Sequence, residues 1–359
     1  MRQTINMTLD YQKFIITIET GLFFRLGGVL ESQYPDKRIA IITDDDTSSV
    51  YGELLAEQMN KANLKWCLIK GPSGESFKDF KNLPGIYKQL TDFRISRNDI
   101  IISFGGGTVN DMAGFVAATY QRGINLIKLP TTLIAQVDAA IGSKCAVNLS
   151  EGKNMAGTYY QPKAIFIDPG FIRTLPDHLL ADGMAEVIKY ACVSDPDLFS
   201  DLMARAATRE AGGLESIIYR CALIKKQALE QDAREKGAAL LLNFGHTLGH
   251  AIENCYPEGR YRHGNAVAIG MNMVTTAGEK MGLTHSGASQ LLQNLLKDYD
   301  IDYSLPKDLS AEQLFNAAKL DKKITAGKLD LVILKHIGSA RIHSIPLDEL
   351  QQFIKIAFE

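Results

Sequence analysis

One segment, DIIISFGGGTVNDMAGFVAATY at 99–120, constrains the fold of this chain more than any other. A run of β-branched residues leads into three glycines and then into an amphipathic stretch, which predicts a buried strand, a tight turn and a helix. Short β-branched runs at 37–46 and 164–169 alternate with helical patterns in the same way. Strands that alternate with helices are typical of a parallel sheet covered by helices. We therefore predict an α/β domain in the first half of the chain.

The second half of the chain has a different pattern. From Leu179 onward long helical patterns dominate, and only 327–345 predicts a late hairpin. We therefore expect two domains, with residues 1–176 in the first and residues 177–359 in the second. A ligand is expected in the cleft between them. The predicted helices lie at 179–193, 213–233, 240–255, 264–282 and 286–299.

Composition narrows the classes of function. A formal net charge of −2 exerts no long-range pull on nucleic acid or on anionic membranes, so local lysines and arginines must hold any anionic ligand. The five cysteines form no CxxC pair, which favours free thiols in a reducing cytosol. The N-terminus lacks a signal-peptide core, and no apolar run reaches about 18 residues. We expect a cytoplasmic protein that binds neither nucleic acid nor a membrane.

The glycine turn is a candidate phosphate site. Gly105, Gly106 and Gly107 stand between a strand and a helix, where glycine lets the backbone approach a phosphate closely. The helix N-terminus then offers free N–H groups and the positive end of the helix dipole. The spacing is not that of GxGxxG, so a simple tight turn is the alternative.

Polar residues follow three other strands of the predicted sheet. Asp44 and Asp46 come at the end of a strand, where ribose hydroxyls are typically held in nucleotide-binding folds. The loops GESFK at 74–78 and LPTTL at 129–133 have a similar place, and their hydroxyl and lysine groups could line a nucleotide pocket. Ordinary solvated loops are the alternative for each of them.

Three histidines and one glutamate predict a metal site. His246 and His250 are four residues apart in NFGHTLGHAIE, so a helix places both imidazoles on one face. His263 follows in RHGNAV, and Glu186 lies in the apolar stretch GMAEVIKY, where a carboxylate is costly unless it is paired or ligated. One glutamate and two histidines are a common ligand set for catalytic zinc. Spacing leaves open whether both His246 and His250 bind the metal or His263 replaces one of them.

Basic residues recur beside glycines and polar turns. Each one alone is most simply a solvated surface charge. As a set they fit a small, anionic, phosphorylated substrate. The set comprises Arg122, Lys144, Lys153 with its neighbour Asn154, Lys189, Lys225, and the pair Lys322 and Lys323.

Eight ordered blocks of this chain, from about Asp44 to Lys323, resemble the 3-dehydroquinate synthase family of sugar-phosphate cyclases. The blocks are FGGGTVNDMAGFVAATYQRG, LPTTLIAQVDAAIGSKCAVN, GKNMAGTYYQPKAIFID, TLP, GMAEVIKY, LNFGHTLGHAIE, HGNAVAIGM and DKK. The resemblance implies an α/β, Rossmann-like NAD-binding domain and a mainly α-helical metal- and substrate-binding domain. It also implies a zinc or cobalt ion and a homodimer.

The resemblance also implies a role for each matching residue. It gives the metal to Glu186, His246 and His263, and it turns His250 toward the substrate. Arg122 is expected to reach the phosphate site of the neighbouring subunit. NAD binding is expected at Asp44, Asp46, Glu75, Lys78, Gly105, Gly106, Gly107, Asp111, Thr131, Thr132, Lys153 and Thr174. Catalysis or substrate binding is expected at Asp138, Lys144, Asn154, Lys189, Lys225, Asn243, His250 and one of Lys322 and Lys323.

The implied reaction converts 3-deoxy-D-arabino-heptulosonate 7-phosphate to 3-dehydroquinate and phosphate, in the shikimate pathway. The metal lowers the pKa of a substrate hydroxyl, and NAD accepts a hydride from the carbon that bears this hydroxyl. Phosphate then leaves by β-elimination, the hydride returns, and an intramolecular aldol addition closes the ring. NAD is thus recycled within one turnover. Lys144 and His250 would stabilise developing charge.

Some positions depart from the family pattern. Ala239 stands where an arginine usually holds the substrate carboxylate, Asn110 replaces a glycine, GGKTAVN has become GSKCAVN, and HGEAVA has become HGNAVA. A related cyclase with a carboxylate-free substrate, sedoheptulose 7-phosphate or glucose 6-phosphate, is therefore the alternative. A metal-dependent alcohol dehydrogenase and a non-catalytic binding protein are rivals from other classes. Net NADH release distinguishes the first rival, and loss of zinc binding would favour the second.

Overall fold

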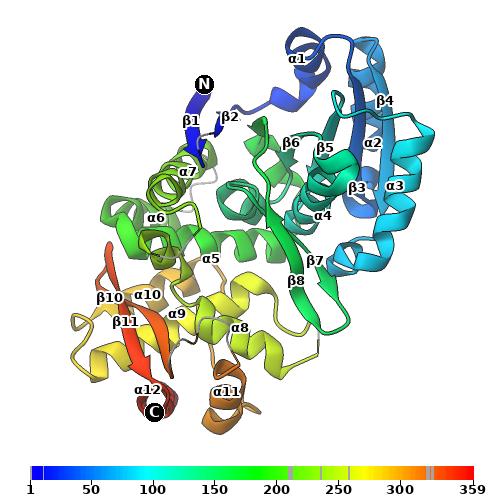
Figure 1. The fold of residues 1–359 in the computed structure, drawn as a ribbon. Coiled ribbons are helices and arrows are strands. Elements are labelled where there is room, and N and C mark those ends of the chain that lie inside the picture. Colours follow the sequence, from blue (N-terminus) through cyan, green and yellow to red (C-terminus); the bar gives the residue numbers. More distant parts are fainter. Residues whose placement is uncertain are drawn as a thin grey trace. The chain divides into compact units, whose positions relative to one another are not determined.

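The computed structural model describes residues 1–359 apart from positions 1, 11, 209–212, 235–236, 258, 321–323 and 325–326. The described chain forms two compact units, Met1–Leu175 and Pro176–Glu359. The first unit is α/β and the second is mainly helical, so the predicted fold class is confirmed. Figure 1 shows the elements of both units.

The described residues of the first unit form a sheet, a hairpin, four α-helices and several short helical turns. Its strands are β1 (Gln3–Leu9), β2 (Gln12–Ile18), β3 (Arg38–Asp44), β4 (Lys65–Gly71), β5 (Ile100–Gly105), β6 (Asn125–Pro130), β7 (Lys144–Leu149), β8 (Gly152–Tyr159) and β9 (Ala164–Ile167). Its helices are α1 (Leu26–Gln33), α2 (Asp45–Lys61), α3 (Leu83–Asp92) and α4 (Gly107–Thr119). Its short helical turns are η1 (Leu22–Arg25), η2 (Glu75–Lys78), η3 (Phe80–Asn82), η4 (Tyr120–Arg122), η5 (Ala135–Ala139) and η6 (Pro169–Thr174).

The sheet has the strand order β1-β2-β9-β6-β5-β3-β4. Every neighbouring pair is parallel except β1 and β2, which form an antiparallel edge. Strands β7 and β8 pair separately as an antiparallel hairpin. The predicted parallel sheet covered by helices is therefore confirmed.

Both faces of the sheet are buried, which explains the continuous apolar runs of its strands. In β3, Ala40 and Ile42 pack into one core with side chains of α3 and α4. The alternate residues Ile39 and Ile41 pack into a second core with side chains of α1 and α2. A strand that alternates between two apolar layers has to be apolar at nearly every position.

The strand order changes direction between β3 and β5. The chain continues from β3 to β4 on one side, whereas β5, β6 and β9 lie on the other side. Ligands of open α/β sheets bind beside the carboxyl ends of the strands at such a point. Here β3 ends at Asp44 and β5 ends at Gly105, so the topology places the predicted nucleotide residues at the position where this fold class binds ligands.

The second unit is built from helices and one hairpin. Its helices are α5 (Asp177–Ser194), α6 (Pro196–Thr208), α7 (Leu214–Gln231), η7 (Ala238–Asn243), α8 (His246–Cys255), α9 (His263–Lys280), α10 (Ala288–Asp298), α11 (Ala311–Ala318) and α12 (Leu347–Phe358). Strands β10 (Lys328–His336) and β11 (Ser339–Pro346) form the predicted late hairpin. No described helix is long and apolar enough to cross a membrane.

The continuous helix predicted at 240–255 is wrong. The chain forms the short turn η7 as far as Asn243, and α8 begins only at His246. Between them Gly245 has a φ of 79°, in the left-handed region that a helix interior does not tolerate. A Cβ there would also lie 2.5 Å from Met271 Cγ, so the break fits only glycine. The break makes His246 the first residue of its helix.

Close backbone approaches bring three helices of the second unit together. A Cβ on Gly270 of α9 would lie 2.1 Å from the Gly245 oxygen, and one on Gly264 would lie 2.3 Å from the Asp182 oxygen of α5. Only glycine permits helices to pack this closely. The first turn of α9, which begins with His263, is thereby held against α5.

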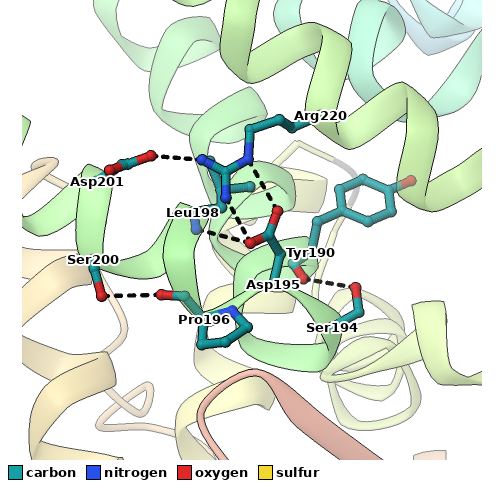
Figure 2. A network of polar contacts seen from close by, with 8 residues as sticks. All are labelled: Tyr190, Ser194, Asp195, Pro196, Leu198, Ser200, Asp201 and Arg220. Carbon is teal, nitrogen blue, oxygen red and sulfur yellow. Dashed lines mark hydrogen bonds and ion pairs between the residues drawn. The ribbon is translucent and has the colours of Figure 1, made fainter.

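A polar network ties α7 to the end of α5 (Figure 2). The Arg220 guanidinium donates from Nε to one Asp195 oxygen at 3.0 Å and from Nη2 to the other at 2.6 Å. It also donates from Nη1 to Asp201 of α6 at 2.5 Å. Asp195 in turn accepts from the Leu198 N–H at 2.9 Å, so one carboxylate joins three helices.

Candidate active site

The second unit brings one glutamate and two histidines together. Glu186 lies on α5, His246 begins α8 and His263 begins α9. The Glu186 Oε1 atom lies 3.6 Å from His246 Nε2 and 3.5 Å from His263 Nε2. One potential ligand atom from each residue lies within 4.8 Å of the other two.

These separations fit a tetrahedral metal. Zinc bonds to histidine nitrogen and carboxylate oxygen of about 2.1 Å place neighbouring ligand atoms roughly 3.4 Å apart. The observed 3.5 and 3.6 Å are close to that value. Two nitrogens and one carboxylate oxygen leave a fourth position for substrate or water, as catalytic zinc sites do. The residues therefore fit a divalent ion such as zinc or cobalt.

The environment of His246 favours Nε2 as the ligand atom. Its Nδ1 lies 3.2 Å from the Phe244 carbonyl oxygen, an acceptor that selects the tautomer with the proton on Nδ1. Burial of the ring and the nearby Lys189 charge hold the pKa of His246 well below its usual range. A neutral imidazole is the form that binds a metal.

His263 has a carboxylate on each side of its ring. Its Nε2 faces Glu186, and its Nδ1 lies 3.7 Å from Glu253 Oε2. Burial lowers the pKa of His263, but the two carboxylates outweigh it and raise the pKa to about 10. A metal-binding histidine commonly points its other nitrogen at a carboxylate, and Glu253 has that position here. Glu253 ends the stretch NFGHTLGHAIE and was not predicted as a site residue.

His250 lies beside this group. Its ring centroid is 5.4 Å from that of His246 and 5.6 Å from that of His263. Two groups of described residues could hold a metal, and neither combines His246 with His250. The second group contains His250, Glu253 and His263, so His263 belongs to both groups. The arrangement favours the option in which His263 takes the place of His250.

Two lysines of the second unit are buried. Lys189 Nζ lies 2.5 Å from Glu186 Oε2, with only 1% of the lysine side chain exposed. Lys225 on α7 is 8% exposed, so neither is the solvated surface charge that a lone lysine usually is. Asn243 ends η7 two residues before the Gly245 break.

The glycine turn of the first unit leads directly into α4. Gly106 is the N-cap residue, and no side chain caps the helix, so its first N–H groups remain available to an anion. The Thr131 N–H donates to the Gly105 oxygen at 3.0 Å, and the methyl group of Thr132 lies 3.2 Å from where a Cβ of Gly106 would be. The two threonines and the glycines therefore come together as a loop cluster.

Asp44 is the N-cap residue of α2, a role that was not predicted. Its carboxylate is buried and accepts from the Thr47 N–H at 2.7 Å, which caps α2. Asp46 is exposed in the first turn of the same helix, and its N–H donates to the Ser73 hydroxyl at 3.0 Å. Capping explains the buried Asp44 without a ligand, and the predicted NAD contacts of Asp44 and Asp46 stay predictions.

Asn148 joins two of the predicted loops and was not predicted. Its Nδ2 donates to Glu75 Oε1 at 2.7 Å, and its Oδ1 accepts from the Asn154 N–H at 2.8 Å. Lys78 is 5% exposed and forms an ion pair with Asp111 of α4. Burial raises the pKa of Asp111, and the Lys78 charge opposes that rise.

The remaining predicted residues of the first unit have the following places. Asp138 lies in η5, which is a π-helical turn, and Lys144 begins β7. Lys153 is exposed on β8, and Thr174 Oγ1 lies 2.5 Å from the Tyr51 hydroxyl. Arg122 has a left-handed φ of 64°, next to Gln121 at 49°. Lys322 and Lys323 lie outside the described residues.

Comparison with known proteins identifies the family. The model of the 3-dehydroquinate synthase N-terminal domain matches residues 68–182, and that of the C-terminal domain matches residues 183–324. A 3-dehydroquinate synthase of Clostridium acetobutylicum is 39% identical over 355 residues, which cover 99% of each chain. The chain belongs to the 3-dehydroquinate synthase family. The resemblance inferred from the eight sequence blocks is confirmed.

Solved structures of other cyclases share the fold of this family member. A 2-epi-5-epi-valiolone synthase of Streptomyces hygroscopicus with NAD⁺ and Zn²⁺ bound has a TM-score of 0.88 at 25% identity, covering 98% of each chain. A 2-deoxy-scyllo-inosose synthase complexed with carbaglucose-6-phosphate, NAD⁺ and Co²⁺ has a TM-score of 0.84 at 23% identity, covering 98% of this chain and 99% of that one.

The departures from the family pattern have distinct structural settings. Ala239 is fully buried, and its N–H donates to Asp232 Oδ2 at 3.2 Å, so its methyl group is enclosed in the protein. Asn265 of α9 donates from Nδ2 to the Asp302 oxygen at 2.6 Å. Cys145 is buried on β7, and burial raises the pKa of its thiol to about 11.

Proposed function

We propose that this protein is an NAD- and metal-dependent 3-dehydroquinate synthase, a phosphate-eliminating carbon–oxygen lyase of the shikimate pathway. Its substrate is 3-deoxy-D-arabino-heptulosonate 7-phosphate, and its products are 3-dehydroquinate and phosphate. The observation that carries the proposal is the Glu186, His246 and His263 group, within a chain that matches a 3-dehydroquinate synthase over 99% of both lengths.

The residues of the second unit bind and polarise the substrate. Glu186, His246 and His263 would hold the ion, and Lys189 compensates the Glu186 charge from the other carboxylate oxygen. His250, beside the metal group, would donate to a substrate oxygen that gains charge. When bound, NAD supplies a hydride acceptor that is regenerated within the turnover, and the metal polarises the adjacent substrate oxygens.

The other predicted residues complete this proposal. Nucleotide binding is proposed for the glycine turn, Asp44, Asp46, Glu75, Lys78, Asp111, Thr131, Thr132, Lys153 and Thr174. Substrate contacts are proposed for Arg122, Asp138, Lys144, Asn154, Lys225 and Asn243, with Lys322 or Lys323. We also propose that the protein is a homodimer in the cytoplasm. We further propose that it binds neither nucleic acid nor a membrane, because a net charge of −2 gives no general attraction to these negatively charged surfaces.

The test is an assay of phosphate release with catalytic NAD and zinc. The heptulosonate phosphate is expected to turn over, with one phosphate released per molecule of product. The absorbance at about 340 nm should not rise, because NADH does not accumulate. Sedoheptulose 7-phosphate and glucose 6-phosphate serve as carboxylate-free controls. Turnover of only a carboxylate-free substrate would contradict the proposal and would make Ala239 the decisive departure. Accumulation of NADH would instead indicate a dehydrogenase.

A further inference from the structure

Asn110 comes directly before Asp111 and stands where the family resemblance leads us to expect a glycine. It lies in the first half of α4, where asparagine is a poorer helix former than most residues. Its side chain is 1% exposed, so the amide is removed from water. A buried amide is costly unless its polar atoms find partners, and the partners of Asn110 point to its task.

The amide of Asn110 connects a strand, the glycine turn and a helix. Its Oδ1 accepts from the Ser103 hydroxyl of β5 at 2.8 Å. Its Nδ2 donates to the Gly105 oxygen at 3.0 Å and to the Gly106 oxygen at 2.8 Å. Both amide hydrogens are therefore directed at carbonyl groups of the turn.

The Asn110 amide gives each of these two carbonyls a second donor, because the Thr131 N–H already donates to the Gly105 oxygen and the Asn110 N–H to the Gly106 oxygen, both at 3.0 Å. Together these bonds fix the direction of the N–H groups in the turn. In a planar trans peptide the C=O of one residue and the N–H of the next point in opposite directions. Holding the carbonyls of Gly105 and Gly106 toward Asn110 therefore turns the N–H groups of Gly106 and Gly107 away from it. Those are the donors that the start of a helix offers to an anion.

We propose that Asn110 is a positioning residue that preorganises the glycine turn for the pyrophosphate of the dinucleotide. The inference rests on the proposed function, because it takes NAD as the ligand of this turn. Three consecutive glycines have wide conformational freedom, and a turn that is ordered before binding loses less entropy when the ligand arrives. The amide also keeps two carbonyl oxygens from facing the phosphate charges.

The test measures dissociation constants by calorimetry for three probes: NAD⁺, ADP-ribose and AMP. Asn110→Ala removes both side-chain bonds to the turn and leaves the two main-chain bonds, and we expect NAD⁺ and ADP-ribose to bind about tenfold more weakly. Asn110→Asp places a carboxylate oxygen against the two carbonyls, so the loss should be larger. AMP lacks a pyrophosphate, and its binding should change by less than about twofold.

Two control variants separate positioning from general loosening of the unit. Ser103→Ala removes a neighbour of the amide but leaves both bonds to the turn, so NAD⁺ affinity should stay within about twofold. Asn125→Ala removes another asparagine bond to a backbone oxygen, that of Asp99 at 3.1 Å, at the amino end of β6. It should lower thermal stability and leave NAD⁺ affinity unchanged.

Three results would overturn the inference. The first is Asn110→Ala protein that binds NAD⁺ as tightly as the wild type. The second is an equal loss for AMP, which would indicate a loosened unit rather than a misplaced turn. The third is wild-type protein that does not bind NAD⁺, and only this result would overturn the proposed function as well.

Discussion

The two oxygens of the Glu186 carboxylate have different neighbours. Oε1 faces the ring nitrogens of His246 and His263, whereas Oε2 lies 2.5 Å from Lys189 Nζ. The side chain is fully buried, and an isolated carboxylate there would be very costly. Lys189 compensates the negative charge of the carboxylate at Oε2. A divalent ion bound at Oε1 would have Glu186, His246 and His263 as its protein ligands.

Glu253 should tune the metal through His263. Because a carboxylate on the second nitrogen orients a ligand histidine and raises its basicity, we expect Glu253→Gln to weaken zinc binding about 10- to 100-fold. Competition with a fluorescent zinc chelator measures that affinity. His263→Ala should lose more, because it removes a ligand, and His250→Ala should keep the metal while slowing turnover.

Glu312→Gln is the matched control for the charge change. Glu312 is an exposed residue of the first turn of α11, so zinc affinity should stay at the wild-type value. Equal affinities of the Glu253→Gln and wild-type proteins would show that Glu253 does not act on the metal. Metal loss in His250→Ala as large as that in His246→Ala would overturn the ligand assignment.

At the scale of elements, Arg220 links the helices that carry Glu186, Lys189 and Lys225 (Figure 2). Asp195 accepts from Nε and Nη2 of its guanidinium and Asp201 accepts from Nη1, and these hydrogen bonds and the charges of the two aspartates raise the pKa of Arg220. Bonds between charged groups that are partly shielded from water stabilise a protein more than exposed ion pairs do. We expect Arg220→Ala to lower the free energy of unfolding by about 1–2 kcal/mol in urea titrations.

The comparison variant is Asp201→Asn. The Asp201 side chain is 60% exposed, and exposed ion pairs contribute roughly 0–1 kcal/mol, so this change should cost much less than Arg220→Ala. Equal losses in the two variants would mean that the Asp195 contact has no special part in joining α5 and α7.

Local patterns predicted elements well where burial follows a simple period. The apolar runs of β3, β5 and β9 and the late hairpin are encoded by neighbouring residues, and all of them were predicted. The end of η7 was missed, because the break depends on the left-handed Gly245 and its contact with Met271 on another helix. Contacts between elements are not visible in a periodicity.

The candidate site shows the same limit. Glu186 could be singled out because a carboxylate in an apolar stretch is costly, and the histidine spacing marked α8. Spacing could not choose between His250 and His263, because that choice depends on how α9 packs against α5 and α8. Asn148 and Glu253 were missed for a related reason: their partners are distant in sequence or lie at the start of another helix.

For the whole molecule, the division of the chain predicts how metal removal affects it. The metal group belongs to the second unit, and its ligands lie on helices that bury apolar residues, as Ala185, Val187 and Ile188 of α5 illustrate. We therefore expect folding of this unit not to depend on the metal in the way that a small zinc domain does. Dialysis against a chelator should abolish phosphate release but leave the helical circular-dichroism signal unchanged.

Adding the ion back should reverse the loss. Zinc or cobalt is expected to restore turnover and to raise the melting temperature by a few degrees, because a ligand that binds only the folded state stabilises it by mass action. Magnesium is the control, since it prefers oxygen ligands and two histidine nitrogens suit it poorly. Loss of helix on chelation would show instead that the ion organises the unit. Full activity after complete metal removal would remove Glu186, His246 and His263 from the chemistry altogether.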